Sequence, residues 1–310
     1  MRRAGPPPPS SSAALPALLT LLALVVACLG CGRGEPPPAP ESNPITRRLL
    51  AAGALVGSIA ENGAHVWRGV PFAAPPLGDL RWRAPRPPEP WEGELRALDA
   101  GPACIQVNGV LGGAHDADLA EGEPAGSEDC LRLNVFAPAF SPGEVPSGDE
   151  RLPVMLWVHG GGNTVGSARI YDGSLLAQKH GLIVVTTNYR LGMLGWLSHA
   201  SLGAGAASAD DASGTFGTLD LIRALEWLRD NVASFGGDPE RVTVFGESAG
   251  GRNVMSLLAS QRAQGLFHRA IAQSGGTASS SLADARNLHD DPDAPGHCLL
   301  YTSPSPRDFS

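Results

Sequence analysis

The sequence has little positive charge and few cysteines. Lys and Arg together number 23 against 31 Asp and Glu, which gives a net charge of −8 at pH 7. Because phosphate backbones and anionic lipid surfaces attract proteins through positive charge, this balance excludes nucleic acid as an expected partner. Five cysteines are too few for a dense disulfide framework, and their odd number leaves at least one without a partner in the chain.

Charged residues make up only 17% of the chain, whereas 43% of the residues are hydrophobic. That proportion provides enough apolar surface for a sizeable core and argues against a wholly disordered protein. A length of 310 residues is sufficient for one large domain or two ordinary ones. No internal repeat is visible in the sequence.

The amino terminus has the layout of a secretory signal. Positive charge in Met1 to Arg3 precedes an uncharged, apolar run from Ala13 to Leu29. This run of about 17 residues is at the lower end of the range that spans a bilayer, so an uncleaved helical anchor remains an alternative. The tetrapeptide Val25-Val26-Ala27-Cys28 resembles the bacterial lipobox, in which cleavage leaves a lipidated cysteine as the first residue. We therefore expect residues 1–28 to be a lipoprotein signal peptide, and the exported protein to be membrane-anchored through Cys28 or else secreted or periplasmic.

Two further features of this region carry no catalytic chemistry. Cys28 and Cys31 form a C-x-x-C pattern, but a redox pattern of this kind is expected between a strand and a helix, not in an apolar export segment. Residues 29–44 are rich in proline and lack hydrophobic periodicity, which is typical of a stiff tether. The folded part is expected to begin near Ile45.

Beyond the tether, short apolar runs alternate with loops and helical patterns. Two nearly continuous apolar segments, Leu152 to Val158 and Leu182 to Thr187, are typical of strands buried on both faces of a parallel sheet. Arg241 to Phe245 and Arg269 to Gln273 are predicted to be further strands. Apolar residues at spacings of three and four predict an amphipathic helix over Leu219 to Val232. The order strand, helix, strand indicates a right-handed crossover and an α/β fold, with a mostly parallel central sheet flanked by helices.

One segment carries the pattern of a catalytic nucleophile. The strand ending at Phe245 runs into Gly246-Glu247-Ser248-Ala249-Gly250 and then into a helical pattern, the setting that a G-x-S-x-G elbow requires. Residues without a Cβ let the chain turn sharply enough to hold the serine in a strained conformation. The backbone N–H groups and the positive end of the following helix favour developing negative charge there. The alternative is an ordinary glycine-rich turn.

A second glycine-rich segment follows the strand that ends at Val158. His159-Gly160-Gly161-Gly162 matches the HGGG-type loop that supplies oxyanion-hole N–H groups, because glycines let the backbone approach a tetrahedral oxyanion. A plain turn remains an alternative, and a phosphate-binding loop would need a Lys-Ser or Lys-Thr pair that this segment lacks. His159 precedes the loop and is expected to be structural, not a catalytic base.

Together with other blocks, these segments resemble the type-B carboxylesterase and cholinesterase family of α/β-hydrolases. The resemblance runs from about Val66 to Gly275, which makes residues 45–276 a partial α/β-hydrolase domain, truncated after the helix that follows the elbow and the next strand. The additional blocks are RGVPFAAPPLGDLRWRAP (68–85), SEDCLRLNVFAP (127–138), NYRLGMLGWL (188–197), GTFGTLD (214–220) and GLFHRAIAQSG (265–275).

The resemblance implies a catalytic role for four residues. Ser248 corresponds to the family's nucleophile, and the N–H groups of Gly161, Gly162 and Ala249 correspond to its oxyanion hole. Asn163 departs from the family pattern, because many members have an aromatic residue there, and this predicts a more polar or more open acyl side of the pocket. Leu221, in place of a usual glutamine, is a second departure, and neither removes a catalytic atom.

The resemblance also implies structural pairs. Cys104 and Cys130 are similar to the family's first disulfide, which export would allow to form, with two buried thiols as the alternative. Arg81 with Glu128, and Arg190 with Asp220, resemble buried ion pairs that hold loops and take no part in catalysis.

The remaining triad members are expected further along the family's chain, in the order Ser, Asp or Glu, then His. Of the later histidines, His268 stands at a position that the family does not use, and His289 and His297 lie in a tail, residues 277–310, without resemblance. Residues 298–308, CLLYTSPSPRD, read as the translation of a sequencing adapter, which would account for the odd cysteine, Cys298. We therefore expect the 310-residue chain to lack the acid and the histidine and to be inactive.

For the natural protein, the sequence predicts an exported serine esterase that hydrolyses small-molecule carboxylic esters through an acyl-enzyme. No metal or nucleotide cofactor is implied. The alternative is a noncatalytic cholinesterase-like binding or adhesion protein at the cell surface, and the intact Ser248 and HGGG loop argue against it.

Overall fold

The computed structural model describes residues 40–109, 118–141 and 143–277. The predicted signal peptide, most of the predicted tether, and all but the first residue of the predicted tail lie outside these residues. Within them, no helix is long and apolar enough to cross a membrane.

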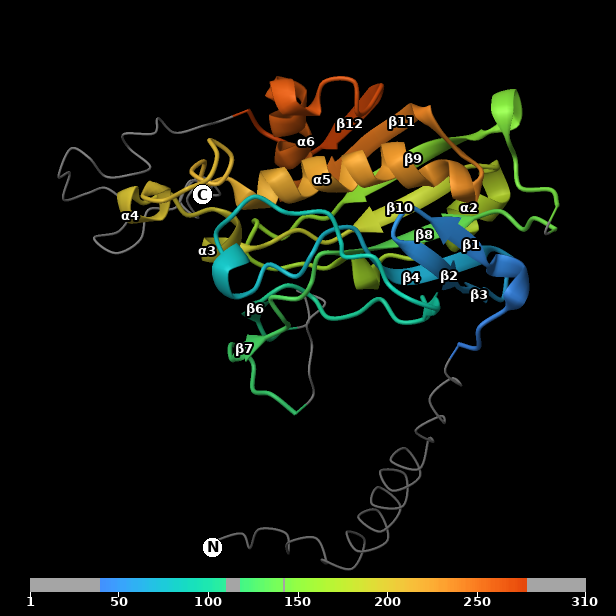
Figure 1. Ribbon diagram of the computed structural model, residues 1–310, viewed down its shortest axis with the longest axis horizontal. Helices are drawn as coiled ribbons and strands as arrows, with labels where there is room; N and C mark the ends of the chain where they lie inside the picture. The colour runs from blue at the N-terminus through green and yellow to red at the C-terminus, as the bar shows by residue number, and fades with distance from the viewer. Residues whose placement is uncertain (1–39, 110–117, 142, 278–310) are drawn as a thin grey trace, which may run out of the picture. The chain divides into compact units, whose positions relative to one another are not determined.

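A seven-stranded sheet forms the centre of the fold (Figure 1), with the strand order β12-β11-β9-β10-β8-β4-β3. The strands β9, β10, β11 and β12 are parallel, as the apolar runs predict. The strands β3, β4 and β8 add an antiparallel edge that the sequence analysis did not predict. The bounds are β3 (Ser58–Ile59), β4 (His65–Pro71), β8 (Arg132–Ala137), β9 (Leu152–Val158), β10 (Ile183–Thr187), β11 (Gly237–Glu247) and β12 (Arg269–Gln273).

Two small sheets accompany the central one. The first has the strand order β1-β2-β5, and the second pairs β6 with β7. The bounds are β1 (Arg48–Leu50), β2 (Gly53–Val56), β5 (Glu94–Arg96), β6 (Gln106–Val107) and β7 (Pro124–Ala125).

Helices cover both faces of the central sheet. The long helix α5 (Phe216–Asn231) packs with α6 (Ala249–Ala259) on one face, where Leu221 and Leu225 of α5 join the main core with Val154 and Val244 of the sheet. On the opposite face, Ala177 of α2 (Ser174–His180) packs in a separate cluster with Phe136 of β8 and Val184 of β10. Two one-turn helices, α3 (Gly192–Gly195) and α4 (Ala200–Gly203), lie in the connection from β10 to α5. The chain therefore has the α/β architecture that the sequence predicts.

The predicted elements differ from the observed ones mainly where polar residues continue a strand. The strands β9 and β12 have the predicted bounds, and α5 begins three residues before the predicted helix. The strand β11 begins at Gly237, four residues before the predicted start, and its register with β9 shifts between Gly237 and Val242. This stretch contains Asp238, Pro239 and Glu240, so it lacks the apolar pattern on which the prediction depends.

Candidate active site

Ser248 lies at the junction of β11 and α6. Its φ of 56° and ψ of −121° are values that residues with a side chain rarely adopt, and such strain is found mainly at functional sites. The Ser248 N–H donates to the carbonyl of Gln273 on β12 at 2.9 Å, which fixes the turn against the neighbouring strand. The side chain is half-buried, at the N-terminal end of α6. The structure thus has the strand-to-helix elbow that the sequence predicts.

The glycines of the elbow are required by close backbone approach. A Cβ on Gly246 would lie 2.7 Å from the carbonyl oxygen of Val158, and a Cβ on Gly250 would lie 2.1 Å from the same oxygen. Both distances are shorter than real Cβ contacts. The end of β9 therefore packs directly on the turn, which brings the residues after Val158 to the serine.

The predicted oxyanion loop lies beside Ser248. A Cβ on Gly160 would lie 3.2 Å from the Cβ of Ser248 and 2.8 Å from the carbonyl oxygen of Glu247. The next residues turn through positive φ angles, 103° at Gly161 and 65° at Gly162, which favour glycine. Among the described residues, the N–H groups of Gly161, Gly162 and Ala249 have no hydrogen-bond acceptor. These groups are thus available to a ligand beside the serine.

Side chains from distant segments hold this loop and the residues that follow it, from His159 to Ala168. The Tyr189 hydroxyl donates to the His159 carbonyl at 2.7 Å. The Gln106 amide accepts from the Gly166 N–H and donates to the Gly166 carbonyl, both at 2.9 Å, so it pairs with the loop as a strand would. The Asn188 side chain accepts from the N–H of Ala168 at 2.8 Å. Because these partners are buried, the loop is held in place before any substrate binds.

No feature of the sequence indicated a role for Gln106, Tyr189 or Asn188. Asn188 and Tyr189 belong to the NYRLGMLGWL block, but nothing in that block indicates which carbonyl or N–H each side chain contacts. Gln106 comes from the short strand β6, about sixty residues before its partner. A polar residue in an apolar setting is the only signal available for such positions.

His159 is a structural residue, as the sequence analysis expects. Its Nδ1 lies 2.8 Å from the Gly160 carbonyl, so Nδ1 carries the hydrogen and donates it. The ring stacks on Tyr189 with centroids 4.4 Å apart. Burial lowers the pKa of His159 to about 4, which keeps the imidazole neutral near pH 7.

Asn163 does not make the pocket wall more polar, one of the two alternatives that its departure from the family pattern suggested, because its amide is buried. Its side chain is 4% exposed and pairs with the amide of Asn253 on α6. The structure therefore turns this amide into the protein, toward the helix that begins after Ser248.

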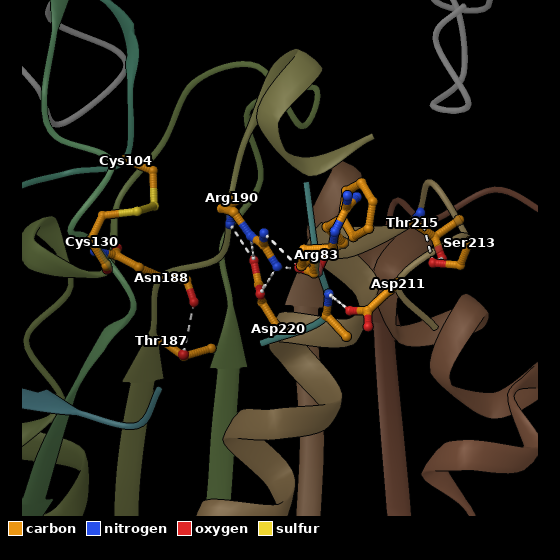
Figure 2. Close-up of polar contacts among 12 residues, drawn as sticks. Arg83, Cys104, Cys130, Thr187, Asn188, Arg190, Asp211, Ser213, Thr215 and Asp220 are labelled. Atoms are coloured by element: carbon orange, nitrogen blue, oxygen red, sulfur yellow. Dashed lines mark hydrogen bonds and ion pairs between the residues drawn. A yellow bond between two sulfur atoms is a disulfide. The ribbon is translucent and has the colours of Figure 1, made fainter. Parts of the chain in front are cut away.

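The two predicted ion pairs form, but only one is buried. Arg190 donates to both carboxylate oxygens of Asp220, at 2.8 and 2.7 Å, and their side chains are 3% and 0% exposed. Figure 2 shows this pair beside Arg83, whose carbonyl accepts another Arg190 hydrogen bond. The pair between Arg81 and Glu128 is also bidentate, but its side chains are 41% and 21% exposed, so the prediction of burial was wrong for it.

Cys104 and Cys130 form the predicted disulfide. Their Cα atoms are 5.0 Å apart, within the range that a disulfide requires, and the bond lies near the Arg190 pair (Figure 2). Both residues are buried. The alternative of two free thiols is thus not what the structure shows.

His268 is not placed to serve as the base for Ser248. The candidate His268 contacts the middle and start of β11: its Nδ1 accepts from the Val242 N–H at 3.2 Å, and its Nε2 lies 3.5 Å from a Glu240 oxygen. Val242 precedes Ser248 by six residues of extended strand, so His268 is remote from the hydroxyl. His289 and His297 lie outside the described residues. Within those residues, no three His, Cys, Asp or Glu side chains cluster as metal ligands would.

The fold and the elbow define an α/β-hydrolase. A sequence profile of the carboxylesterase family matches residues 46–290, and the chain belongs to this family. It is 46% identical to para-nitrobenzyl esterase of Bacillus subtilis (strain 168) over 222 residues, which cover 71% of this chain and 42% of that protein. It is 42% identical to carboxylesterase 3 of Homo sapiens over 270 residues, which cover 86% of this chain and 45% of that protein.

Solved structures agree with the family assignment. A structure titled PNB esterase matches 79% of this chain and 47% of its own chain, with a TM-score of 0.68 and 42% identity. Carboxylesterase EST55 of Geobacillus stearothermophilus matches 73% of this chain and 43% of its own, with a TM-score of 0.61 and 37% identity. The chain thus spans less than half the length of these relatives.

Proposed function

We propose that the protein carrying this chain is a serine esterase that hydrolyses carboxylic esters through an acyl-enzyme. The observation that carries the proposal is the strained Ser248 beside a glycine loop whose N–H groups lack acceptors among the described residues. Membership of the carboxylesterase family, with relatives named as esterases, supports the same chemistry. Nothing in the described residues favours the noncatalytic binding or adhesion alternative.

In the proposed reaction, the Ser248 hydroxyl oxygen attacks the ester carbonyl carbon while a histidine removes the hydroxyl proton. The histidine and its orienting acid come from outside the described residues. The carbonyl oxygen becomes an oxyanion, to which Gly161, Gly162 and Ala249 donate their N–H groups. Collapse of this intermediate expels the alcohol, which takes the proton from the histidine, and leaves the acyl group on Ser248.

Water then attacks the acyl-enzyme in the same series of steps. The histidine removes a proton from water, the acid product leaves, and Ser248 regains its hydrogen. Each oxyanion-hole donor contributes roughly 3 kcal/mol to lowering such a barrier. The start of α6 adds the positive end of its dipole to the same position. The protein's own groups supply this chemistry, so the proposal includes no cofactor.

The proposed substrate class is small-molecule carboxylic esters. The relatives' names include a para-nitrobenzyl esterase and, at 44% identity, the fumonisin B1 esterase of Sphingopyxis macrogoltabida. These names refer to different esters, so the class is proposed at the level of the ester bond.

We further propose that the protein is exported and anchored through lipidated Cys28. The charged start, the apolar run and the lipobox-like tetrapeptide of residues 1–28 support this proposal, together with the disulfide, which is typical of exported proteins.

The test compares Ser248→Ala with Ser256→Ala, a control on the exposed side of the same helix, in protein expressed from the complete gene. Wild type and Ser256→Ala are expected to hydrolyse a short-chain p-nitrophenyl ester and to be labelled by a fluorophosphonate. Ser248→Ala is expected to do neither. Turnover that survives Ser248→Ala, or a folded wild-type protein without turnover, would contradict the proposal.

A further inference from the structure

A pair of buried amides joins the glycine loop to α6. The Asn253 Nδ2 donates to the Asn163 Oδ1 at 2.9 Å, and the Asn163 Nδ2 donates to the Asn253 Oδ1 at 3.4 Å. Each residue is 4% exposed, and the two are ninety positions apart in the chain. The side chains therefore face each other as a reciprocal pair, shielded from water.

One asparagine lies next to the oxyanion loop, and the other lies in the helix that follows the nucleophile. Asn163 directly follows Gly162 in the oxyanion loop, and Asn253 lies just over one turn into the helix that starts after Ser248. The Tyr189 and Gln106 hydrogen bonds attach the loop to other segments of the protein. The hydrogen bonds of the asparagine pair attach it to the helix of the nucleophile itself.

Asparagine suits the loop position for a second reason. Asn163 has a φ of 58°, in the left-handed region that asparagine and glycine adopt more readily than other residues. Its carbonyl accepts from the Gly192 N–H at 2.7 Å, so both its backbone and its side chain are held. The Tyr189 hydroxyl also lies 3.4 Å from the Asn163 Oδ1, so the two amides belong to a buried polar network, and breaking the hydrogen bonds between them is unfavourable.

We propose that Asn163 and Asn253 are positioning residues that fix the N–H groups of Gly161 and Gly162 relative to Ser248. This inference rests on the proposed esterase function. The pair touches no reacting atom: it sets the distance between the oxyanion donors and the nucleophile. Displacement of donors by a fraction of an ångström weakens stabilisation of the transition state more than binding of the neutral ester.

The experiment measures kcat and KM for a p-nitrophenyl ester with Asn253→Ala and Asn163→Gly, each in protein from the complete gene. Asn163→Gly keeps the left-handed backbone accessible and removes the whole side chain, the amide included. Each variant is expected to lose roughly 10- to 100-fold in kcat, with KM within about twofold of wild type. The inhibition constant of a trifluoromethyl ketone, which forms an anionic adduct with the serine, is expected to rise by the same factor as kcat falls.

Two comparisons separate positioning from a general loss of structure. The double variant is expected to be no slower than the slower single variant, since the two residues act as one unit. Asn231→Ala removes another buried asparagine, at the end of α5, where its side chain contacts Trp227 and Ala51. This control is expected to lower the midpoint of thermal unfolding as the site variants do, while kcat stays at the wild-type value.

Folded single variants with kcat within twofold of wild type would overturn the positioning role while leaving the esterase function intact. Strictly multiplicative losses in the double variant would overturn it as well. A folded wild-type protein without turnover would overturn the esterase function, and the positioning role with it.

Discussion

Tyr189 and His159 contact each other in two ways: the Tyr189 hydroxyl donates to the His159 carbonyl at 2.7 Å, and the two rings stack with centroids 4.4 Å apart. The tyrosine thereby fixes both the backbone and the side chain of the residue that begins the glycine loop. Burial lowers the pKa of His159, and the stacked Tyr189 ring is one of the groups that cover the imidazole.

His159 is expected to make the protein less stable as pH falls from about 6.5 to about 4. Its pKa in the folded protein is about 4, against an ordinary value of 6.5, so the unfolded chain binds more protons across this interval. Folding stability therefore falls as pH decreases, by about 3 kcal/mol in total, and the loss is complete below the folded pKa.

Denaturant titrations of wild type and His159→Asn at several pH values test this pH dependence of folding stability. The asparagine keeps a donor for the Gly160 carbonyl but does not titrate. The difference in unfolding free energy between the two proteins is expected to change with pH only in that interval. A constant difference from pH 7 to pH 4 would show that His159 titrates normally.

Asp220→Asn is expected to destabilise the protein by roughly 3 to 5 kcal/mol, because it leaves the buried Arg190 guanidinium without a carboxylate. Glu128→Gln is the matched control, since it breaks an equally well-formed bidentate pair that water reaches. Its expected loss is far smaller. Equal losses in the two variants, measured by denaturant titration, would mean that burial does not decide the strength of these pairs.

Replacing both disulfide cysteines, as Cys104→Ser with Cys130→Ser, is expected to lower the unfolding free energy by roughly 3 to 4 kcal/mol, because a loop spanning 26 positions is no longer closed in the unfolded chain. A reductant should bring wild type to the stability of the double variant and leave the variant unchanged. A wild-type protein indifferent to reductant, although its thiols become titratable, would contradict this account.

Cys28→Ala is expected to block lipidation, because the thioether to the lipid requires that sulfur. In a bacterial host, the wild-type protein should fractionate with membranes and carry the mass of a lipid, whereas the variant should lose both properties. Cys31→Ala is the control and should behave as wild type. Membrane association that persists in Cys28→Ala would instead indicate an uncleaved apolar anchor.

The elements nearest to the chemistry were the most predictable from the sequence. The strands β9 and β12 have their predicted bounds, but β12 lacks the predicted burial, because it lies at the edge of the sheet and four of its five residues are exposed. The antiparallel strand β8 was missed, although its residues are nearly all buried, because Arg132 and Asn134 interrupt its apolar pattern. Asn253 was missed too, although a polar residue on the buried side of an amphipathic helix is a detectable signal.

The sequence by itself determined the elbow at Ser248 and the loop at Gly160 to Gly162. Both are recognisable in the sequence because only glycine permits backbone contacts as short as those that Gly246 and Gly250 make with the Val158 carbonyl. Tertiary structure alone decided which polar side chains would be buried together. Arg190 with Asp220 and Arg81 with Glu128 look alike as sequence, yet only the first pair is buried. The pairing of Asn163 with Asn253 likewise arises only when β9 and β11 lie side by side and bring residues ninety positions apart into contact.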